Sequence, residues 1–375
     1  MTQPEAVSAP SGSVHPLKLY YERNESRIAA AAFVAGFLFD VLTLARVDSW
    51  LAIGQQLAYL TVIAAVLLQM FFEDAAPAAL DTAPAVKRWY YRYRTAVVHF
   101  LFGSLLNLYT IYYFKSSSLL VSFSFMAFIA FLVIANESKR FKSLGLPFKF
   151  ALLALCLLSF FAHVTPIFAG STGLRVFMLS MLVGSLPLIG ITATIRVRAP
   201  AYFAKARRQI LAPWAIVLVA FLAFYMLRLT PPVPLSIPFI GVYHAVERTA
   251  EGYRLSHERP RWRFWHNGDQ AFLARPGDRV YVFFRIFSPV RFSDTVLARW
   301  YWKDPARGWM LQDSIPINIV GGREPGFRGY GVKSNYQPGS WKVQVETTDG
   351  REIGRIYFHL ELAPAAPRNF EIDVQ

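Results

Sequence analysis

The sequence predicts two domains of different class, an N-terminal all-α transmembrane bundle of seven helices and a C-terminal all-β antiparallel sandwich. Three observations lead to this prediction. Of the 375 residues, 54% are hydrophobic and only 17% are charged, with a mean hydropathy of +0.33, which is too apolar for an ordinary soluble enzyme. The apolar residues come in blocks long enough to span a bilayer. After residue 238 the pattern changes to short alternating runs, which are typical of strands.

Seven apolar blocks of roughly 17–22 residues match the thickness of the hydrocarbon layer, and most lack the polar stripe of a buried soluble helix. Residues 1–27 precede them and are predicted to form a flexible N-terminus without a cleavable signal peptide, because residues 1–17 are polar. The transmembrane domain is predicted to cover residues 28–228. The blocks are residues 28–44, 51–72, 95–114, 117–135, 147–168, 176–195 and 209–227.

The segment between the two domains is rich in proline. Pro231, Pro232 and Pro234 follow closely on the last apolar block. Proline lacks the backbone N–H of a helix, and its ring blocks the preceding turn. Residues 229–240 are therefore predicted to form a hinge.

The charges between the blocks predict the orientation. Sixteen Lys and Arg residues flank the blocks on one side of the predicted membrane and four on the other, and the alternation has no exception. The cation-rich side is expected to be cytoplasmic, which places the N-terminus in the cytoplasm and, after seven spans, the second domain outside. The run RWYYRYR at residues 88–94 is typical of a membrane-anchoring belt, with anionic lipid as its expected partner.

Short runs with a period of two predict the sandwich of the second domain, at residues 241–362. They are rich in β-branched and aromatic residues and are separated by Gly, Pro and Asp. About 125 residues suffice for one core, so this domain is expected to fold alone as an immunoglobulin-like (Ig-like) sandwich. Residues 363–375 are expected to be a frayed tail. The runs are residues 242–246, 253–257, 279–287, 295–302, 341–346 and 353–362.

The alternation also predicts which side chains face the core and where the chain turns. Asp349-Gly350 is a strong hairpin signal, and Glu251-Gly252 is another. Trp300 and Trp302 share one face of their strand, so at least that face is expected to be buried. The other core-facing side chains are expected to be Trp341, Val343, Val345, Ile356, Phe358 and Leu360.

No recognisable catalytic motif is present: the sequence lacks a P-loop, a dinucleotide-binding glycine fingerprint, His-Glu-x-x-His and Gly-x-Ser-x-Gly. The single cysteine, Cys156, can form no internal disulfide. The net charge of +15 lies mostly between the apolar blocks, which argues against nucleic acid. We therefore expect a non-enzymatic protein without cofactor, metal or nucleic-acid partner. Four histidines that lack metal-ligand spacing are interpreted as structural or surface residues: His244, His257, His266 and His359.

Scattered polar residues inside the blocks are expected to pair with one another. An unpaired charge there costs at most roughly 2.5–3.5 kcal/mol. Asp40 is expected to pair with Arg175 or Arg46. Arg175 is geometrically the easier partner, because Arg46 lies six residues along the same helix, about 240° around it. A transport path would need a chain of such groups, so structural pairing is favoured. The remaining polar residues of this kind are His99, Asn107 and His163.

The most unusual stretch of the second domain is residues 321–330, in which half of the residues are Gly or Pro. One interpretation is a shaped loop between strands. The other is an exposed surface for an anionic or sugar-bearing partner. The partner-binding residues would then be Arg323, Phe327, Arg328, Tyr330 and Lys333.

Several motifs resemble a bacterial family, the domain of unknown function 2914. The second domain carries RWRFW at 261–265, ARPGDRV at 274–280, GGRE at 321–324, FRG at 327–329, QPGSWKV at 337–343 and GRI at 354–356. The first domain resembles long members through YYERNE at 20–25 and GFLFDVLTL at 36–44. The resemblance implies a bacterial inner-membrane protein with a periplasmic β domain, and it brings no activity or catalytic residue.

The sequence thus favours a non-enzymatic inner-membrane protein whose periplasmic β domain binds a protein partner or an envelope polymer. The alternative is a small-solute transporter or intramembrane enzyme that acts within the helices. The first hypothesis expects the functional residues in the loops of the β domain, and the second expects them at Asp40, His99, Asn107 and His163.

Overall fold

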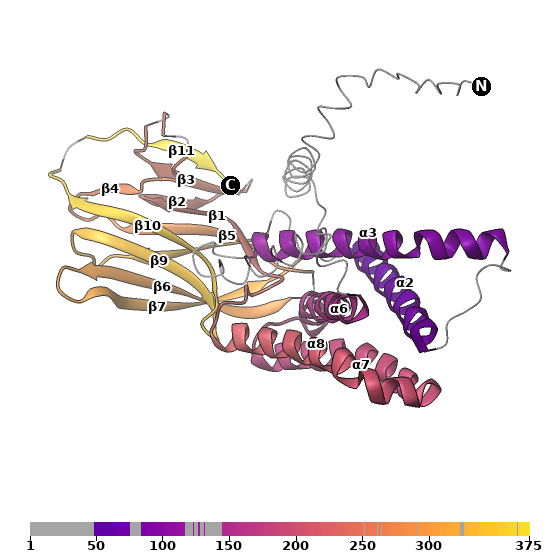
Figure 1. Cartoon of the computed structure of the whole chain (residues 1–375). Helices are drawn as coiled ribbons and strands as arrows, with labels where there is room; N and C mark the ends of the chain where they lie inside the picture. The colour runs from indigo at the N-terminus through magenta and orange to yellow at the C-terminus, as the bar shows by residue number, and fades with distance from the viewer. Residues whose placement is uncertain are drawn as a thin grey trace, which may run out of the picture. The chain divides into compact units, whose positions relative to one another are not determined.

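The structure is a computed structural model, and all the residues that it describes belong to one compact unit, Arg46–Gln375. Among the described residues it consists of long apolar helices followed by a β domain (Figure 1). The side chains of residues 74, 75, 87–89, 92 and 96 are not described. The described residues are 49–75, 84–116, 123, 127, 131 and 145–375, the last range without 251, 261, 264, 291, 323–325 and 366.

Five helices of the described part are long and apolar enough to cross a membrane. Gly and Pro set several of their ends: α6 begins after Gly145 and ends at Gly170, whose φ is 69°, and α8 begins at Pro200. The helices α3 and α8 extend beyond the predicted apolar blocks into the basic segments before them. The bounds are α2 Trp50–Ala75, α3 Ala85–Lys115, α6 Leu146–Ala169, α7 Leu174–Arg198 and α8 Pro200–Met226.

These five helices correspond to five of the seven predicted blocks. The block at residues 28–44 lies outside the described residues, together with Asp40 and Arg46. Of the block at residues 117–135, only residues 123, 127 and 131 are described, and all three are helical. The helices share one apolar core, which includes Phe102 and Phe150.

Eleven strands of the described part form three sheets. Their orders are β1-β5-β8, β4-β10-β9-β6-β7 and β11-β3-β2. The bounds are β1 Ser236–Tyr243, β2 Ala245–Arg248, β3 Tyr253–His257, β4 Ala271–Ala274, β5 Val280–Phe287, β6 Ser293–Asp304, β7 Gly308–Val320, β8 Phe327–Lys333, β9 Gly339–Thr347, β10 Glu352–Leu362 and β11 Glu371–Val374.

The first two sheets enclose the main core of the domain, as the alternating pattern predicted. Trp300 is buried, and Trp302 is partly buried against the same core. The turn at Asp349-Gly350 joins β9 to β10, with Gly350 at a φ of 82°. The other core-facing side chains of the prediction are all buried: Trp341, Val343, Val345, Ile356, Phe358 and Leu360.

Three features differ from the prediction. The sandwich is not purely antiparallel, because the edge strand β4 pairs with β10 in parallel. It also extends beyond residues 241–362, since β1 begins at Ser236. The last residues are not a frayed tail, because β11 pairs antiparallel with β3. The sequence pattern did not predict this strand.

The proline-rich segment is a packed connector rather than an open hinge. Residues 230–235 are all buried. Val233 belongs to the core of the helices, and Leu235, two residues later, belongs to the core of the sandwich. The connector therefore links the two cores directly.

Polar contacts between the helices and the sandwich reinforce this link. The Tyr225 hydroxyl at the end of α8 donates a hydrogen bond to Asp349 over 2.6 Å. Thr172, in the turn between α6 and α7, donates its N–H and its hydroxyl to Asp294, both over 2.8 Å. The β domain therefore lies against the α6–α7 turn and the end of α8.

Candidate functional site

A pocket of about 280 Å³ opens beside strand β4. We call it the His244 pocket. Loops at the ends of β1, β3 and β4 form it, so its residues come from separate parts of the chain. Its lining consists of His244, Glu258, Arg259, Pro260, Arg263, His266, Gly268, Asp269, Gln270, Ala271 and Leu273.

Gly268 brings the loop before β4 against β1. Its φ is 69°, and a Cβ at this position would lie only 1.9 Å from the carbonyl oxygen of Val242, so no other residue fits without displacement. Next to it, the N–H of Asp269 donates to the same carbonyl oxygen over 2.7 Å. This close approach places the Asp269 carboxylate beside His244.

His244 lies between β1 and β2, with its side chain only 2% exposed. Its ring stacks on Phe272, with 4.0 Å between centroids. Arg368 Nη1 lies 3.2 Å from Nδ1, and because a guanidinium can only donate, Nδ1 must accept. The neutral ring therefore carries its proton on Nε2, which lies 3.4 Å from Asp269 Oδ2 and 3.6 Å from Glu258 Oε2.

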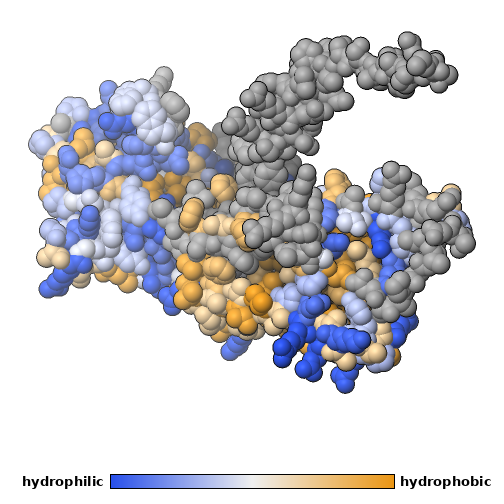
Figure 2. Space-filling view, viewed as in Figure 1, coloured by the Kyte–Doolittle hydropathy of each residue, from blue (hydrophilic) through white to orange (hydrophobic). Residues whose placement is uncertain are grey.

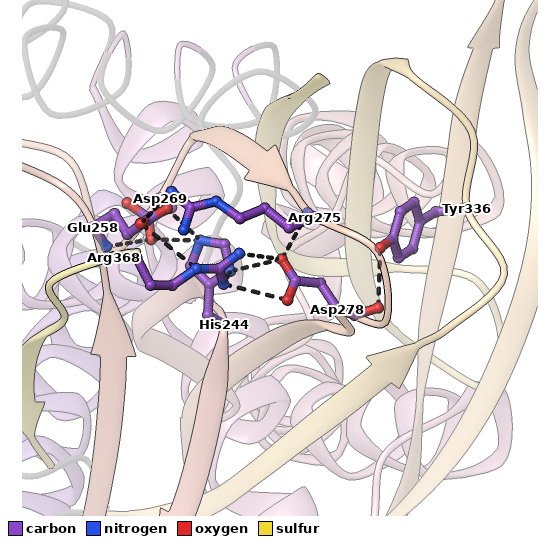
Figure 3. A network of polar contacts seen from close by, with 7 residues as sticks. All are labelled: His244, Glu258, Asp269, Arg275, Asp278, Tyr336 and Arg368. Atoms are coloured by element: carbon purple, nitrogen blue, oxygen red, sulfur yellow. Dashed lines mark hydrogen bonds and ion pairs between the residues drawn. The ribbon is translucent and has the colours of Figure 1, made fainter. Parts of the chain in front are cut away.

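A charged network surrounds this histidine (Figure 3). Arg368 Nη2 donates to Asp278 Oδ2 over 2.7 Å. Arg275 Nη2 donates to Glu258 Oε1 over 3.3 Å, and the Glu258 N–H donates to Asp269 Oδ2 over 2.7 Å. The network fixes one oxygen of Glu258 and leaves the other on the side of the histidine.

The pKa values of the network follow from burial and from the arginines. Burial, followed by the charge of Arg368, lowers the pKa of His244 to about 4. Burial raises the pKa of Asp269 to about 6. Burial also acts to raise the pKa of Asp278, but the hydrogen bonds from Arg368 and Arg275 outweigh it, so that this pKa is lowered. At neutral pH the imidazole is therefore neutral and the carboxylates carry charge.

Three buried atoms of residues that line the pocket have no hydrogen-bond partner among the described residues: Arg259 Nε and the facing pair considered next. The facing pair is His244 Nε2 and Glu258 Oε2. Their separation of 3.6 Å does not give hydrogen-bond geometry. An unpaired buried polar atom costs about 1–3 kcal/mol, so a bound group that satisfied both would gain from doing so.

Two exposed tryptophans lie on the loop that lines the pocket. Trp262 is 61% exposed and Trp265 is 59% exposed. Their rings meet edge to face, with 5.7 Å between centroids, and the Arg263 guanidinium lies 4.8 Å above the ring of Trp262. Exposed indoles grouped beside a pocket are typical of a binding surface.

The C-terminal segment contacts His244 and the charged network around it. Arg368 supplies the contacts to Asp278 and His244, and the ring of Phe370 lies 5.5 Å from the ring of His244. Asp373 of β11 lies 3.3 Å from His257 Nε2, which is itself buried. The sequence pattern assigned no role to this segment.

The partner-binding residues that the sequence indicated lie mostly on strand β8, not in a loop; Arg323 lies outside the described residues. Phe327 packs against the core of the sandwich, Arg328 is half-buried, and Tyr330 is 43% exposed. Lys333 pairs with Asp313. None of the four described residues of this set lines the His244 pocket, and the role of the set in binding stays a prediction.

The polar residues of the predicted spans are dispersed. Arg175 is exposed at the start of α7. His99 and Asn107 lie on α3, eight residues apart, or about 12 Å along the axis. His163 of α6 is buried beside the ring of Tyr113, with 4.6 Å between centroids, and its Nδ1 lies 2.7 Å from the Ser159 carbonyl oxygen. The predicted partner of Arg175, Asp40, lies outside the described residues.

Sequence reasoning missed the His244 pocket because its members are distant in the chain. His244 was interpreted as structural, and the loop with Trp262 and Trp265 was noted only for its motif. The sequence signal that could have indicated this pocket is a pair of tryptophans within four residues, Trp262 and Trp265, followed by Gly268-Asp269. Within the described residues, no group of three or more His, Cys, Asp or Glu side chains is placed to hold a metal ion.

Comparison with known proteins identifies one family region. Residues 293–360 match the family model described as "Protein of unknown function (DUF2914)", which covers strands β6 to β10 apart from its last residues. No curated protein matches. A solved structure, the Pseudomonas fluorescens alkylpurine DNA glycosylase AlkC bound to DNA containing an abasic site analog, aligns with 81% of this chain and 97% of its own, at 12% identity and a TM-score of 0.22. That score is too low to indicate a common fold.

Proposed function

We propose that this chain, whose residues 293–360 carry a DUF2914 domain, is a membrane-anchored, non-enzymatic binding protein of the bacterial envelope. Its β domain binds a polyhydroxylated envelope polymer, a glycan, at the His244 pocket. The observation that carries the proposal is the pair of unsatisfied buried atoms, His244 Nε2 and Glu258 Oε2, in a pocket beside two exposed tryptophans.

The chemistry of this atom pair favours a hydroxyl group. His244 Nε2 presents a proton and Glu258 Oε2 presents a lone pair, 3.6 Å apart. A hydroxyl donates and accepts at once, so one hydroxyl can satisfy both atoms. Trp262 and Trp265 add apolar faces for the C–H surface of a sugar ring. The volume of about 280 Å³ lies near the lower end of the usual ligand pockets, about 300–1,000 Å³, and suits one small unit of a larger molecule.

The arrangement of charge supports a membrane orientation with the β domain outside. Figure 2 shows apolar surface over the helices and hydrophilic surface at the end of α7 and α8 that lies away from the β domain. The β domain contacts the opposite ends, at Thr172 and Tyr225. Together with the sixteen-to-four distribution of cations in the sequence, this supports seven spans, a cytoplasmic N-terminus and a periplasmic β domain. Anionic lipid is the expected partner of the cation-rich ends.

A binding panel tests the function. The full-length chain in detergent would be applied to immobilised oligosaccharides of one to six units, built from glucose, galactose, mannose, rhamnose, N-acetylglucosamine or uronic acid. We expect saturable binding of at least one series. The double variant Trp262→Ala/Trp265→Ala should bind at least about tenfold more weakly, since each buried indole contributes on the order of 1 kcal/mol.

Trp50→Ala is the matched control, because Trp50 is also an exposed indole, 72% exposed, but lies at the start of α2. It should bind as the unchanged protein does. No binding to any member of the panel, or equal loss in the control and in the double variant, would contradict the proposed function.

A further inference from the structure

The outer face of the five-stranded sheet carries an aromatic cluster that the His244 pocket does not use. The Lys342 Nζ lies 4.2 Å from the centroid of the Tyr301 ring and 5.4 Å from that of Trp309. The rings of Trp309 and Tyr357 lie 5.8 Å apart. We call Tyr301, Trp309, Lys342 and Tyr357 the aromatic cluster.

The strand register shows that these side chains share one face. Lys342 pairs with Tyr357 of β10 on one side and with Tyr301 of β6 on the other, and directly paired residues point to the same face. The neighbouring residues Trp341 and Phe358 point into the core. Trp309 is 38% exposed and Tyr357 is 42% exposed, so the outer sides of these rings are free for contact.

The same face continues to the His244 pocket. On β4, Phe272 and Ala274 are buried, whereas Ala271 and Leu273 point outward and line the pocket. Ala271 pairs with His359 of β10, which lies two residues beyond Tyr357 on the same outward face. Strands lie about 4.8 Å apart and rise about 3.4 Å per residue, so the backbone at Ala271 is about 8 Å from that at Tyr357.

The polar groups on this face suit an uncharged polymer. Arg355 pairs with Glu352, and Arg299 lies 2.9 Å from Glu346, so these two arginines are already compensated. Between the pocket and the cluster, Ser340 Oγ lies 3.3 Å from His359 Nδ1. Among the described residues, this surface offers aromatic rings and hydrogen-bonding groups, whereas a nucleic acid would require a stripe of unpaired cations.

We propose that the glycan held in the His244 pocket extends across β10 and stacks on the aromatic cluster, so that the β domain recognises an oligosaccharide of several units. This inference rests on the proposed function, because it takes the pocket as the first subsite. The occupant is one chain that runs across the strands, from the pocket beside β4 toward Trp309 on β7.

A length series tests the extension. Using the series that binds in the panel, the dissociation constants of the two-unit and six-unit oligomers would be measured for the full-length chain in detergent. We expect the six-unit oligomer to bind at least about tenfold more tightly. In Trp309→Ala/Tyr357→Ala this advantage should disappear while the affinity for the two-unit oligomer is unchanged. Val320→Ala, which removes a 50% exposed apolar side chain from the other end of β7, should keep the advantage.

Different results would refute the His244 pocket and the extension over the aromatic cluster. Equal affinity of short and long oligomers in the unchanged protein would overturn the extension and leave the pocket standing. The extension would also be wrong if the aromatic-cluster variant, with an unchanged melting temperature, kept the length advantage or lost affinity for the two-unit oligomer. Glu258→Ala should weaken both oligomers alike, and retention of two-unit binding in this variant would overturn the pocket itself.

Discussion

Asp269 and His244 are predicted to give the β domain two opposite pH dependences of stability that cancel in the unchanged protein. Burial raises the pKa of Asp269 from 3.8 to about 6. A carboxyl group with a raised pKa stabilises the folded state fully below pH 3.8, and this contribution is lost as the pH rises through 6. The difference between the two pKa values corresponds to about 3 kcal/mol.

His244 acts in the other direction. Burial and the charge of Arg368 lower its pKa from 6.5 to about 4, so the neutral ring stabilises the folded state fully above pH 6.5. This contribution, also about 3 kcal/mol, is lost as the pH falls through 4. Between pH 6.5 and 4 the folded state takes up a proton at Asp269 and the unfolded state takes one up at His244. The two effects therefore offset each other.

Removing one group should expose the effect of the other. Relative to the unchanged protein, Asp269→Asn should become less stable as the pH falls from 6.5 to 4, by up to about 3 kcal/mol. His244→Asn should become relatively more stable over the same range. For a domain of this size the change corresponds to about 10 °C in melting temperature.

The measurement is thermal unfolding of the full-length chain in detergent, followed by tryptophan fluorescence at a series of pH values. His359→Asn is the control, because that side chain is 54% exposed, and its curve should run parallel to that of the unchanged protein. The reasoning would be refuted if the curves of melting temperature against pH for Asp269→Asn and His244→Asn also ran parallel to that of the unchanged protein. Neither buried group would then have the pKa that its burial predicts.

Three further predictions concern the stability of the β domain and the membrane topology. Trp300→Ala should cost about 3–5 kcal/mol of sandwich stability, measured by thermal unfolding, because the ring is fully buried; a loss below 1 kcal/mol would contradict this. Tyr225→Phe should lower the melting temperature through loss of one hydrogen bond to a carboxylate, about 1.5–3 kcal/mol, and should not do so in an Asp349→Ala background, which has no acceptor. Alkaline phosphatase fused after Gln375 should be active and a cytoplasmic reporter there inactive; the reverse would refute the topology.

The sequence predicted those features that depend on local periodicity. The apolar blocks gave the five described helices, and the period of two placed Trp341 and Val343 in the core, because burial of one strand face needs only alternation. The parallel pairing of β4 was not predictable in this way. The four residues of β4 carry no sequence signal for the strand with which they pair, and Ala271 pairs with His359, 88 residues further along the chain.

The candidate site was the least predictable part, since it depends on long-range geometry. His244, Asp269 and Arg368 each resemble ordinary surface or structural residues in the sequence. The fold brings them together in two ways. Gly268 allows its loop to approach β1 closely, and the segment before β11 places Arg368 beside His244. The string RWRFW, by contrast, marked the correct loop, but its exposure could be known only from the structure.

The connector joins the β domain to the helices through packed side chains. A binding domain on a flexible linker could turn freely relative to its anchor. Here Val233 and Leu235 fill the cores on either side of a single proline, and close-packed cores do not yield to small displacements. Tyr225 and Asp349 add a hydrogen bond at the same junction. Under the proposed function, a force on a polymer bound at the outer sheet face would therefore reach α8 through these packed residues.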